Sequence, residues 1–71
     1  MQTFGKNLKS VREASGLNQE QLAVLMNTSQ QRVSEWERGK VEPTLYNLIK
    51  LIKALNSSFE ELTDGILSDS Q

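Results

Sequence analysis

A run of hydrogen-bonding side chains between residues 30 and 38 has the clearest chemistry in this sequence of 71 residues. If the run is helical, each residue advances by about 100° around the axis. Val33 and Trp36 then fall on one side of the helix, and the pattern predicts that they face a core. The opposite side carries amide, hydroxyl, carboxylate and guanidinium groups, on Gln30, Gln31, Ser34, Glu35 and Arg38.

These groups are of the kinds that contact the edges of base pairs. A glutamine amide can bond adenine at two points, and an arginine can contact guanine or phosphate. We therefore interpret the polar side of this helix as a surface for the major groove of DNA. The alternative is that Gln30 and Gln31 form only a solvated first turn, and the neighbouring elements decide between the two interpretations.

Catalysis and metal binding find little support in the sequence. Ser29 and Ser34 would need a base to act as nucleophiles, and the sequence contains no histidine. It also contains no cysteine, which excludes a thiolate metal site and a redox pair. Glu60, Glu61 and Asp64 lack the ligand spacing and the glycine of a calcium loop. We expect no enzymatic activity, no cofactor and no metal.

Two short helices joined by a tight turn are predicted to position the polar side. Asn18 is a typical N-cap and begins a capping-box pattern for a helix over Gln19–Met26. Ser29 caps the next helix, Gln30–Arg38. The connection is three residues long and includes Asn27, a residue type that enters the left-handed region at low cost. The two helices must therefore cross at a steep angle, as in a helix-turn-helix unit.

Three further helices are expected, over Thr3–Ser15, from Thr44 to Leu55, and in a short segment after Ser58. The inward side chains of the first are Phe4, Leu8 and Val11. The inward stripe of the second is predicted at Leu45, Leu48, Ile49, Ile52 and Leu55. The last of the three helices contains Phe59 and Leu62. No segment has the alternation of a strand, so the sequence predicts an all-α fold, a compact five-helix bundle.

The central segments resemble a known family. The runs Leu17–Ala23 and Thr28–Lys40 are similar to the Cro/C1-type (Xre) helix-turn-helix family of phage-repressor-like DNA-binding proteins, and Pro43–Leu45 and Ala54–Leu62 are similar to its last two helices. The resemblance implies a lambda-repressor-like domain, which we expect over residues 1–65, with a C-terminal tail over 66–71. It also implies a homodimer on a palindromic operator in double-stranded DNA.

The same resemblance implies a role for individual residues. The base-reading positions of the third helix correspond to Gln30, Gln31, Ser34 and Glu35. Gln19 matches a position that contacts phosphate, and we expect Arg38 and Lys40 to contact phosphates as well. Arg12 and Glu37 match a pair that joins the first helix to the end of the third. The alternative is two unrelated surface charges, but Glu37 would lie next to the core face, which favours the pair.

The distribution of charge permits DNA binding without proving it. The net charge of the sequence is −1, but residues 1–53 hold all eight bases and five acids, for a net +3. Residues 54–71 hold four acids and no base. An acidic tail with no function is an equally good interpretation of this asymmetry. The sequence shows neither a signal-peptide pattern nor an apolar run that could span a membrane, so we expect a cytoplasmic protein. The family resemblance implies that it belongs to a bacterium or phage.

Two classes of function remain. The first is a sequence-specific transcriptional regulator, either a repressor or an activator, with repression favoured. The second is a protein-interaction module with the same fold, such as an antitoxin that binds a toxin partner. Apolar side chains outside the helix-turn-helix unit are the candidates for a dimer contact: Tyr46, Leu51, Phe59, Ile66 and Leu67.

Overall fold

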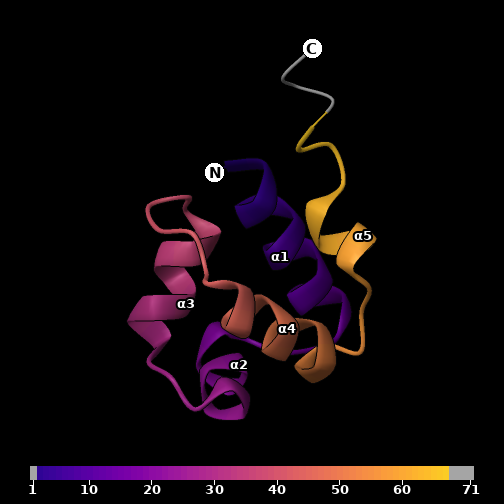
Figure 1. The fold of residues 1–71 in the computed structure, drawn as a ribbon. Coiled ribbons are helices and arrows are strands. Elements are labelled where there is room, and N and C mark those ends of the chain that lie inside the picture. Colours follow the sequence, from indigo (N-terminus) through magenta and orange to yellow (C-terminus); the bar gives the residue numbers. More distant parts are fainter. Residues whose placement is uncertain (1, 68–71) are drawn as a thin grey trace.

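The computed structural model describes residues 2–67 and contains five helices in that range (Figure 1). They are α1 (Gln2–Ala14), α2 (Gln19–Met26), α3 (Gln30–Glu37), α4 (Leu45–Ala54) and α5 (Phe59–Thr63). No strand occurs in the described range. The all-α prediction is therefore confirmed, and each predicted helix is present with ends that differ by one residue at most.

Helix α1 lies at the centre of the fold, between α3 on one side and α5 on the other (Figure 1). Helix α2 packs against α3 and α4. The α1–α5 contact is secured by Asn7, whose Nδ2 donates to the carbonyl oxygens of Leu62 and Asp64 at 3.1 and 2.9 Å. Among residues 2–67, no helix has both the length and the apolar character needed to cross a bilayer.

The predicted caps determine where α2 begins and ends. Asn18 accepts a hydrogen bond from the backbone N–H of Gln21 at 2.7 Å, and the Gln21 side chain accepts from the Asn18 N–H at 2.8 Å, which completes the capping box. Asn27 ends the helix in the left-handed conformation, at φ 56°. Lys50 of α4 then donates to the carbonyl oxygen of Met26 at 2.8 Å. A cation thus satisfies an orphan carbonyl at the negative end of α2.

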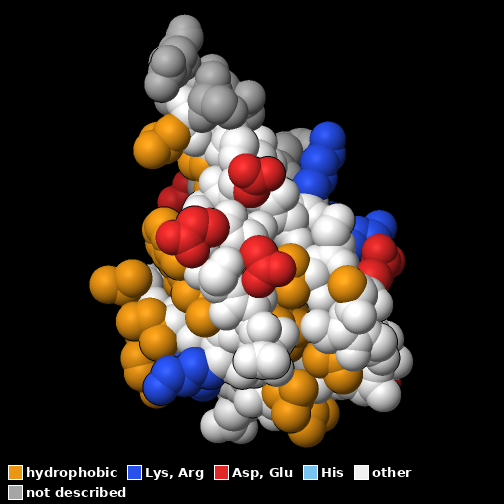
Figure 2. Space-filling model, turned by 90° about the vertical axis from the view of Figure 1, so that its right-hand side faces the viewer, with side chains coloured by type: hydrophobic (Ala, Val, Ile, Leu, Met, Phe, Trp, Pro, Cys, Tyr) orange, Lys and Arg blue, Asp and Glu red, His pale blue; other side chains and the backbone are white. Residues whose placement is uncertain are grey.

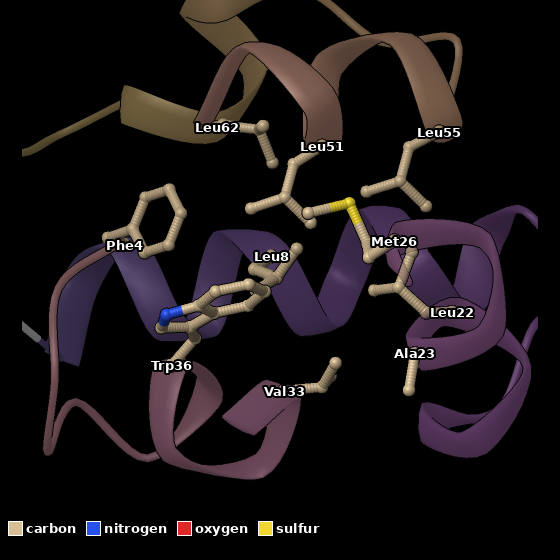
Figure 3. Close-up of a cluster of buried hydrophobic side chains, with 10 residues drawn as sticks. All are labelled: Phe4, Leu8, Leu22, Ala23, Met26, Val33, Trp36, Leu51, Leu55 and Leu62. Carbon is tan, nitrogen blue, oxygen red and sulfur yellow. The ribbon is translucent and has the colours of Figure 1, made fainter. Parts of the chain in front are cut away.

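The core gathers side chains from all five helices (Figure 3). Its fully buried members of largest volume include Trp36, Leu8, Leu22, Met26, Leu51 and Leu62. Val33 and Trp36 are 0% and 1% exposed, so the prediction that they face the core is confirmed. Of the predicted tail, Ile66 packs against the core and Leu67 is exposed, whereas residues 68–71 lie outside the described range.

The prediction of which side of α4 faces the core was wrong. Leu45 and Ile49 were expected inside, but they are 71% and 46% exposed. Leu51 was expected to contact a second subunit, but it is completely buried, which removes it from any interface. Leu51 and the C-cap residue Leu55 are buried, with Leu48 and Ile52 partly buried beside them, so the buried side is rotated from the predicted one toward Leu51. The leucine and isoleucine side chains of this helix and its C-cap span an arc of about 160°, which is wider than the side that the core covers, so periodicity alone does not select the buried part of that arc.

A close approach of α1 and α3 depends on Gly5, which the sequence analysis did not single out. Gly5 is buried, and a Cβ atom added there would lie 2.2 Å from the carbonyl oxygen of Glu37 and 2.9 Å from that of Trp36. Both atoms belong to the backbone of α3 and cannot rotate away. Any side chain at position 5 would therefore push the end of α3 away from α1.

Replacement of Gly5 by alanine should destabilise the domain. Alanine is better than glycine in a helix by about 1 kcal/mol, but overpacking against backbone costs about 1–3 kcal/mol. Because neither neighbour can move independently, we expect a net loss, seen as a melting temperature lower by roughly 4 °C or more.

Gly16→Ala gives the comparison for backbone strain without overpacking. Its added Cβ would meet no atom within 4 Å, but its φ of +77° makes the substitution strained at a cost of about 1–2 kcal/mol. A gain in stability for Gly5→Ala would contradict the proposed closeness of the two helices.

Candidate nucleic-acid interface

Helix α3 is fixed at its start by a cap and on its inner side by the core. The Ser29 hydroxyl accepts a hydrogen bond from the backbone N–H of Arg32 at 3.1 Å, so the helix begins at Gln30. Val33 and Trp36 are buried beneath it. This anchoring sets the rotation of α3, and the polar side predicted from the sequence consequently faces outward.

The four predicted base-reading residues lie on the outer face of α3. Gln30 and Gln31 are exposed, and Ser34 and Glu35 are half-buried. Gln31 Nε2 donates to Glu35 Oε2 at 3.4 Å, and Arg32 Nε lies 3.8 Å from Glu35 Oε1. The carboxylate of Glu35 is thus shared between an amide and a cation on the preceding turn.

Gln19, the predicted phosphate contact, lies beside the start of α3. It is the first residue of α2, and its Oε1 accepts a hydrogen bond from Gln30 Nε2 at 3.5 Å. Its own Nε2 donates to Glu37 Oε1 at 3.0 Å. The fold therefore brings a predicted phosphate contact and a predicted base-reading residue into one hydrogen-bonded group.

Arg12 and Glu37 form the predicted ion pair, which is confirmed in bidentate form. Arg12 Nε and Nη2 donate to Glu37 Oε2 and Oε1 at 2.6 and 3.1 Å, and the two side chains are 8% and 3% exposed. Arg12 Nη1 also donates to the carbonyl oxygen of Leu17 at 2.8 Å. The hydrogen bond to Glu37 raises the pKa of Arg12 above its ordinary value, against the opposing effect of burial.

The two predicted phosphate-binding cations, Arg38 and Lys40, are exposed and follow the C-terminal end of α3. Backbone hydrogen bonds hold this end. The N–H of Arg38 donates to the carbonyl oxygen of Ser34 at 2.9 Å, and the N–H of Lys40 donates to the carbonyl oxygen of Glu35 at 3.0 Å. The amides of Gln30 and Gln31 thus lie at one end of α3, and the cations lie at the other.

Comparison with known proteins identifies the family. A family model described as a helix-turn-helix matches residues 8–62, which is well over half of the chain. The chain belongs to the Cro/C1-type helix-turn-helix family. Members of this family are regulators of transcription that bind double-stranded DNA, and they are not enzymes. The expected family and fold are therefore confirmed.

Individual members of the family are similar over most of this chain. Repressor protein C2 of Salmonella phage P22 is 33% identical over 97% of the chain, and the chain spans 32% of that repressor's length. An uncharacterised helix-turn-helix regulator of Sinorhizobium fredii, y4dJ, is 40% identical over 82% of the chain and 75% of its own length. The crystal structure of the restriction-modification controller protein C.AhdI from Aeromonas hydrophila aligns with a TM-score of 0.81 and 39% identity, over 86% of this chain and 92% of that one.

Within this Cro/C1-type domain, the hydrogen bonds that Gln19 makes to Glu37 and Gln30 were missed from the sequence. Gln19 was expected to face only phosphate, but its amide nitrogen is bonded to Glu37. The number of hydrogen bonds that Glu37 can accept could have indicated this contact. A carboxylate accepts up to about four hydrogen bonds, and Arg12 supplies only two, so a second donor at this buried group was to be expected.

Loss of Glu37 should destabilise this domain much more than loss of Glu35. Glu37→Ala strands the buried guanidinium of Arg12, at a cost of about 3–5 kcal/mol. Glu35 is paired with an exposed arginine at 3.8 Å, and such a pair is worth about 0–1 kcal/mol. Thermal unfolding should show a drop of roughly 10 °C or more for Glu37→Ala and a few degrees at most for Glu35→Ala. Equal effects would mean that the Arg12–Glu37 pair does not join α1 to α3 in solution.

Proposed function

We propose that this chain represses transcription by binding a palindromic operator as a homodimer, with α3 of each copy in the major groove. The observation that carries the proposal is the outer face of α3, where Gln30 and Gln31 are exposed at the start of a helix anchored from behind by Trp36. In helix-turn-helix proteins, residues near the start of the second helix of the unit contact the base edges. The names of two relatives, a repressor and a controller protein, support a regulatory role.

The base contacts are assigned by the chemistry of each side chain. The amides of Gln30 and Gln31 fit adenine, which offers an N7 acceptor beside an N6 donor. Ser34 and Glu35 follow one turn later on the same face. The hydroxyl of Ser34 can serve as donor or acceptor, and the carboxylate of Glu35 can accept from the N4 amino group of cytosine.

The phosphate contacts are assigned to Gln19, Arg38 and Lys40, which flank the base-reading face. Gln19 begins α2, where free backbone N–H groups and the helix dipole favour an anion. Arg38 and Lys40 are exposed beyond the other end of α3. These contacts fix the position of α3 on the duplex without adding base preference. Binding to operator DNA places the working protein in the cytoplasm of the bacterial host.

Gln30→Ala and Gln31→Ala should each relax base preference locally. A bidentate amide contact is worth about 1–3 kcal/mol of discrimination, so each variant should lose roughly five-fold or more of its preference at one position of each half-site. Arg38→Ala and Lys40→Ala are the comparison. They should weaken binding to all sequences alike and reduce the salt dependence by about one unit per phosphate contact.

The measurement begins with selection of bound duplexes from a random DNA pool. Affinities of each variant are then measured for the selected operator, its single-position substitutions and an unrelated duplex, at several salt concentrations. Full sequence preference in the Gln30→Ala, Gln31→Ala double variant would refute the assignment of α3 as the reading helix.

A homodimer is proposed because one copy of α3 is too short to define a site. Its eight residues extend about 12 Å at 1.5 Å per residue, which covers only about four base pairs. Two copies that read half-sites about 34 Å apart remove this limit. The molecule measures 36 × 22 × 21 Å along its principal axes, so equivalent helices of two adjacent copies can reach that separation.

The surface proposed for the dimer contact is the exposed apolar side of α4 and α5. Figure 2 views the molecule from the side that carries α5 in Figure 1, and hydrophobic side chains gather along one edge of this view, beside acidic ones. The residues that α4, α5 and the following turn leave most exposed are Leu45, Tyr46, Ile49, Phe59 and Leu67. Tyr46 is also contacted by the ammonium group of Lys50, at 5.4 Å from the ring centre.

Ile49→Glu should abolish or strongly weaken the dimer and lower operator affinity, because it places a charge in the proposed apolar contact. Val24→Glu is the matched control, since Val24 is 75% exposed on α2, outside the proposed contact. Analytical ultracentrifugation, with and without a palindromic duplex, measures both variants and the parent protein. A strict one-to-one complex of the parent with that duplex at saturating protein would refute the dimer and favour the interaction-module alternative.

A further inference from the structure

Four polar side chains form a continuous row from the interior of the fold to the reading face of α3. Arg12 donates to both oxygens of Glu37 at 2.6 and 3.1 Å. Gln19 Nε2 donates to Glu37 Oε1 at 3.0 Å, and Gln30 Nε2 donates to Gln19 Oε1 at 3.5 Å. Exposure rises along the row, from the buried ion pair through half-buried Gln19 to exposed Gln30.

The buried carboxylate dictates the direction of every bond in this row. An ionised carboxylate only accepts hydrogen bonds, so the amide nitrogen of Gln19 has to face Glu37. The amide oxygen of Gln19 is thereby turned toward α3, where it can only accept. Gln30 must consequently direct its own nitrogen toward Gln19, which leaves its oxygen and its second N–H for another molecule.

The atoms that Gln30 keeps available match one base edge. One N–H and one carbonyl oxygen are what adenine requires for a bidentate contact, through N7 and the N6 amino group. A glutamine held in this orientation before binding loses less rotational freedom when it meets the base. If the row is broken, the amide of Gln30 can rotate freely and presents its donor and acceptor in no fixed order.

We propose that Glu37, held by Arg12, is a positioning residue for base reading, because it fixes the orientation of the Gln30 amide through Gln19. This inference rests on the proposed function of α3. It assigns to the ion pair a role in sequence preference that is separate from its role in stability. It also gives Gln19 a second task beside the contact with phosphate.

Two variants break the row at different points. Glu37→Gln replaces the carboxylate with an amide of the same shape, which can face Gln19 with either its oxygen or its nitrogen. Gln19→Leu removes the middle member of the row. It leaves both hydrogen bonds between Arg12 and Glu37 in place. Since the second variant keeps the buried pair, it remains informative if Glu37→Gln fails to fold.

Leu8→Val is the matched control for stability. Leu8 is completely buried and belongs to α1, and its loss of one methylene lowers stability without removing any polar atom from the row. All variants are kept at a temperature where circular dichroism shows them folded. Each is then measured on the selected operator, on its full set of single-position substitutions and on an unrelated duplex.

The expected result is a loss of preference confined to the position that Gln30 reads, which is the position where Gln30→Ala loses its preference. A bidentate contact discriminates by a factor of about 5 to 150. We expect Glu37→Gln and Gln19→Leu to lose roughly five-fold or more of the preference there and to retain the preference at the position of Gln31. Leu8→Val should retain both.

The possible failures are distinguishable. If Gln30→Ala itself leaves every preference unchanged, the proposed role of Gln30 in base reading is refuted, and this inference with it. If Gln30→Ala removes the preference but Gln19→Leu leaves it intact, the reading role stands and the positioning role of Glu37 is overturned. A loss in Leu8→Val equal to that in Glu37→Gln would likewise overturn it, because the effect would then follow stability alone.

Discussion

The guanidinium of Arg12 lies where three segments of the chain meet. It belongs to α1, donates to the carbonyl oxygen of Leu17 in the loop before α2, and holds Glu37 at the end of α3. Such a buried pair is often no more stabilising than apolar side chains of the same volume, yet it tolerates only one arrangement of its donors and acceptors. It therefore fixes the end of α3 relative to α1 and to the loop before α2, and together with buried Val33 and Trp36 it orients the reading face.

Close packing behind α3 complements this directional constraint. Gly5 allows the backbones of α1 and α3 to approach at the end where Glu37 lies, and Trp36 fills the space on the core side. The ion pair and the glycine thus act on the same end of α3. The start of α3 depends on the Ser29 cap and on Gln19 instead. A rigid element that is held at both ends is what precise placement of side chains on DNA requires.

Most of the fold could be predicted because its helix ends are encoded locally. Asn18, Ser29, Thr44 and Ser58 each accept a bond from the N–H three residues later, as their types indicate. The rotation of α4 could not be predicted, because its leucine and isoleucine side chains span a wide arc and contact with α2 selects the part of that arc that is buried. The role of Gly5 was equally inaccessible, since it depends on a carbonyl oxygen more than 30 residues away. At the site, the residue types indicated which chemical groups are present, but the row from Glu37 to Gln30 forms only when the start of α2 lies beside α3.

The central position of α1 has a consequence for how the chain is made. This helix leaves the ribosome before either of its partners, and Asn7 finds its acceptors at Leu62 and Asp64, 55 and 57 residues later. A helix of 13 residues is only marginally stable by itself in water. Its apolar side therefore stays uncovered during synthesis until α5 has emerged, and the five helices assemble together rather than one by one. A message truncated ahead of α5 would accordingly produce a chain with an open apolar surface, a substrate for chaperones and proteases rather than a smaller regulator.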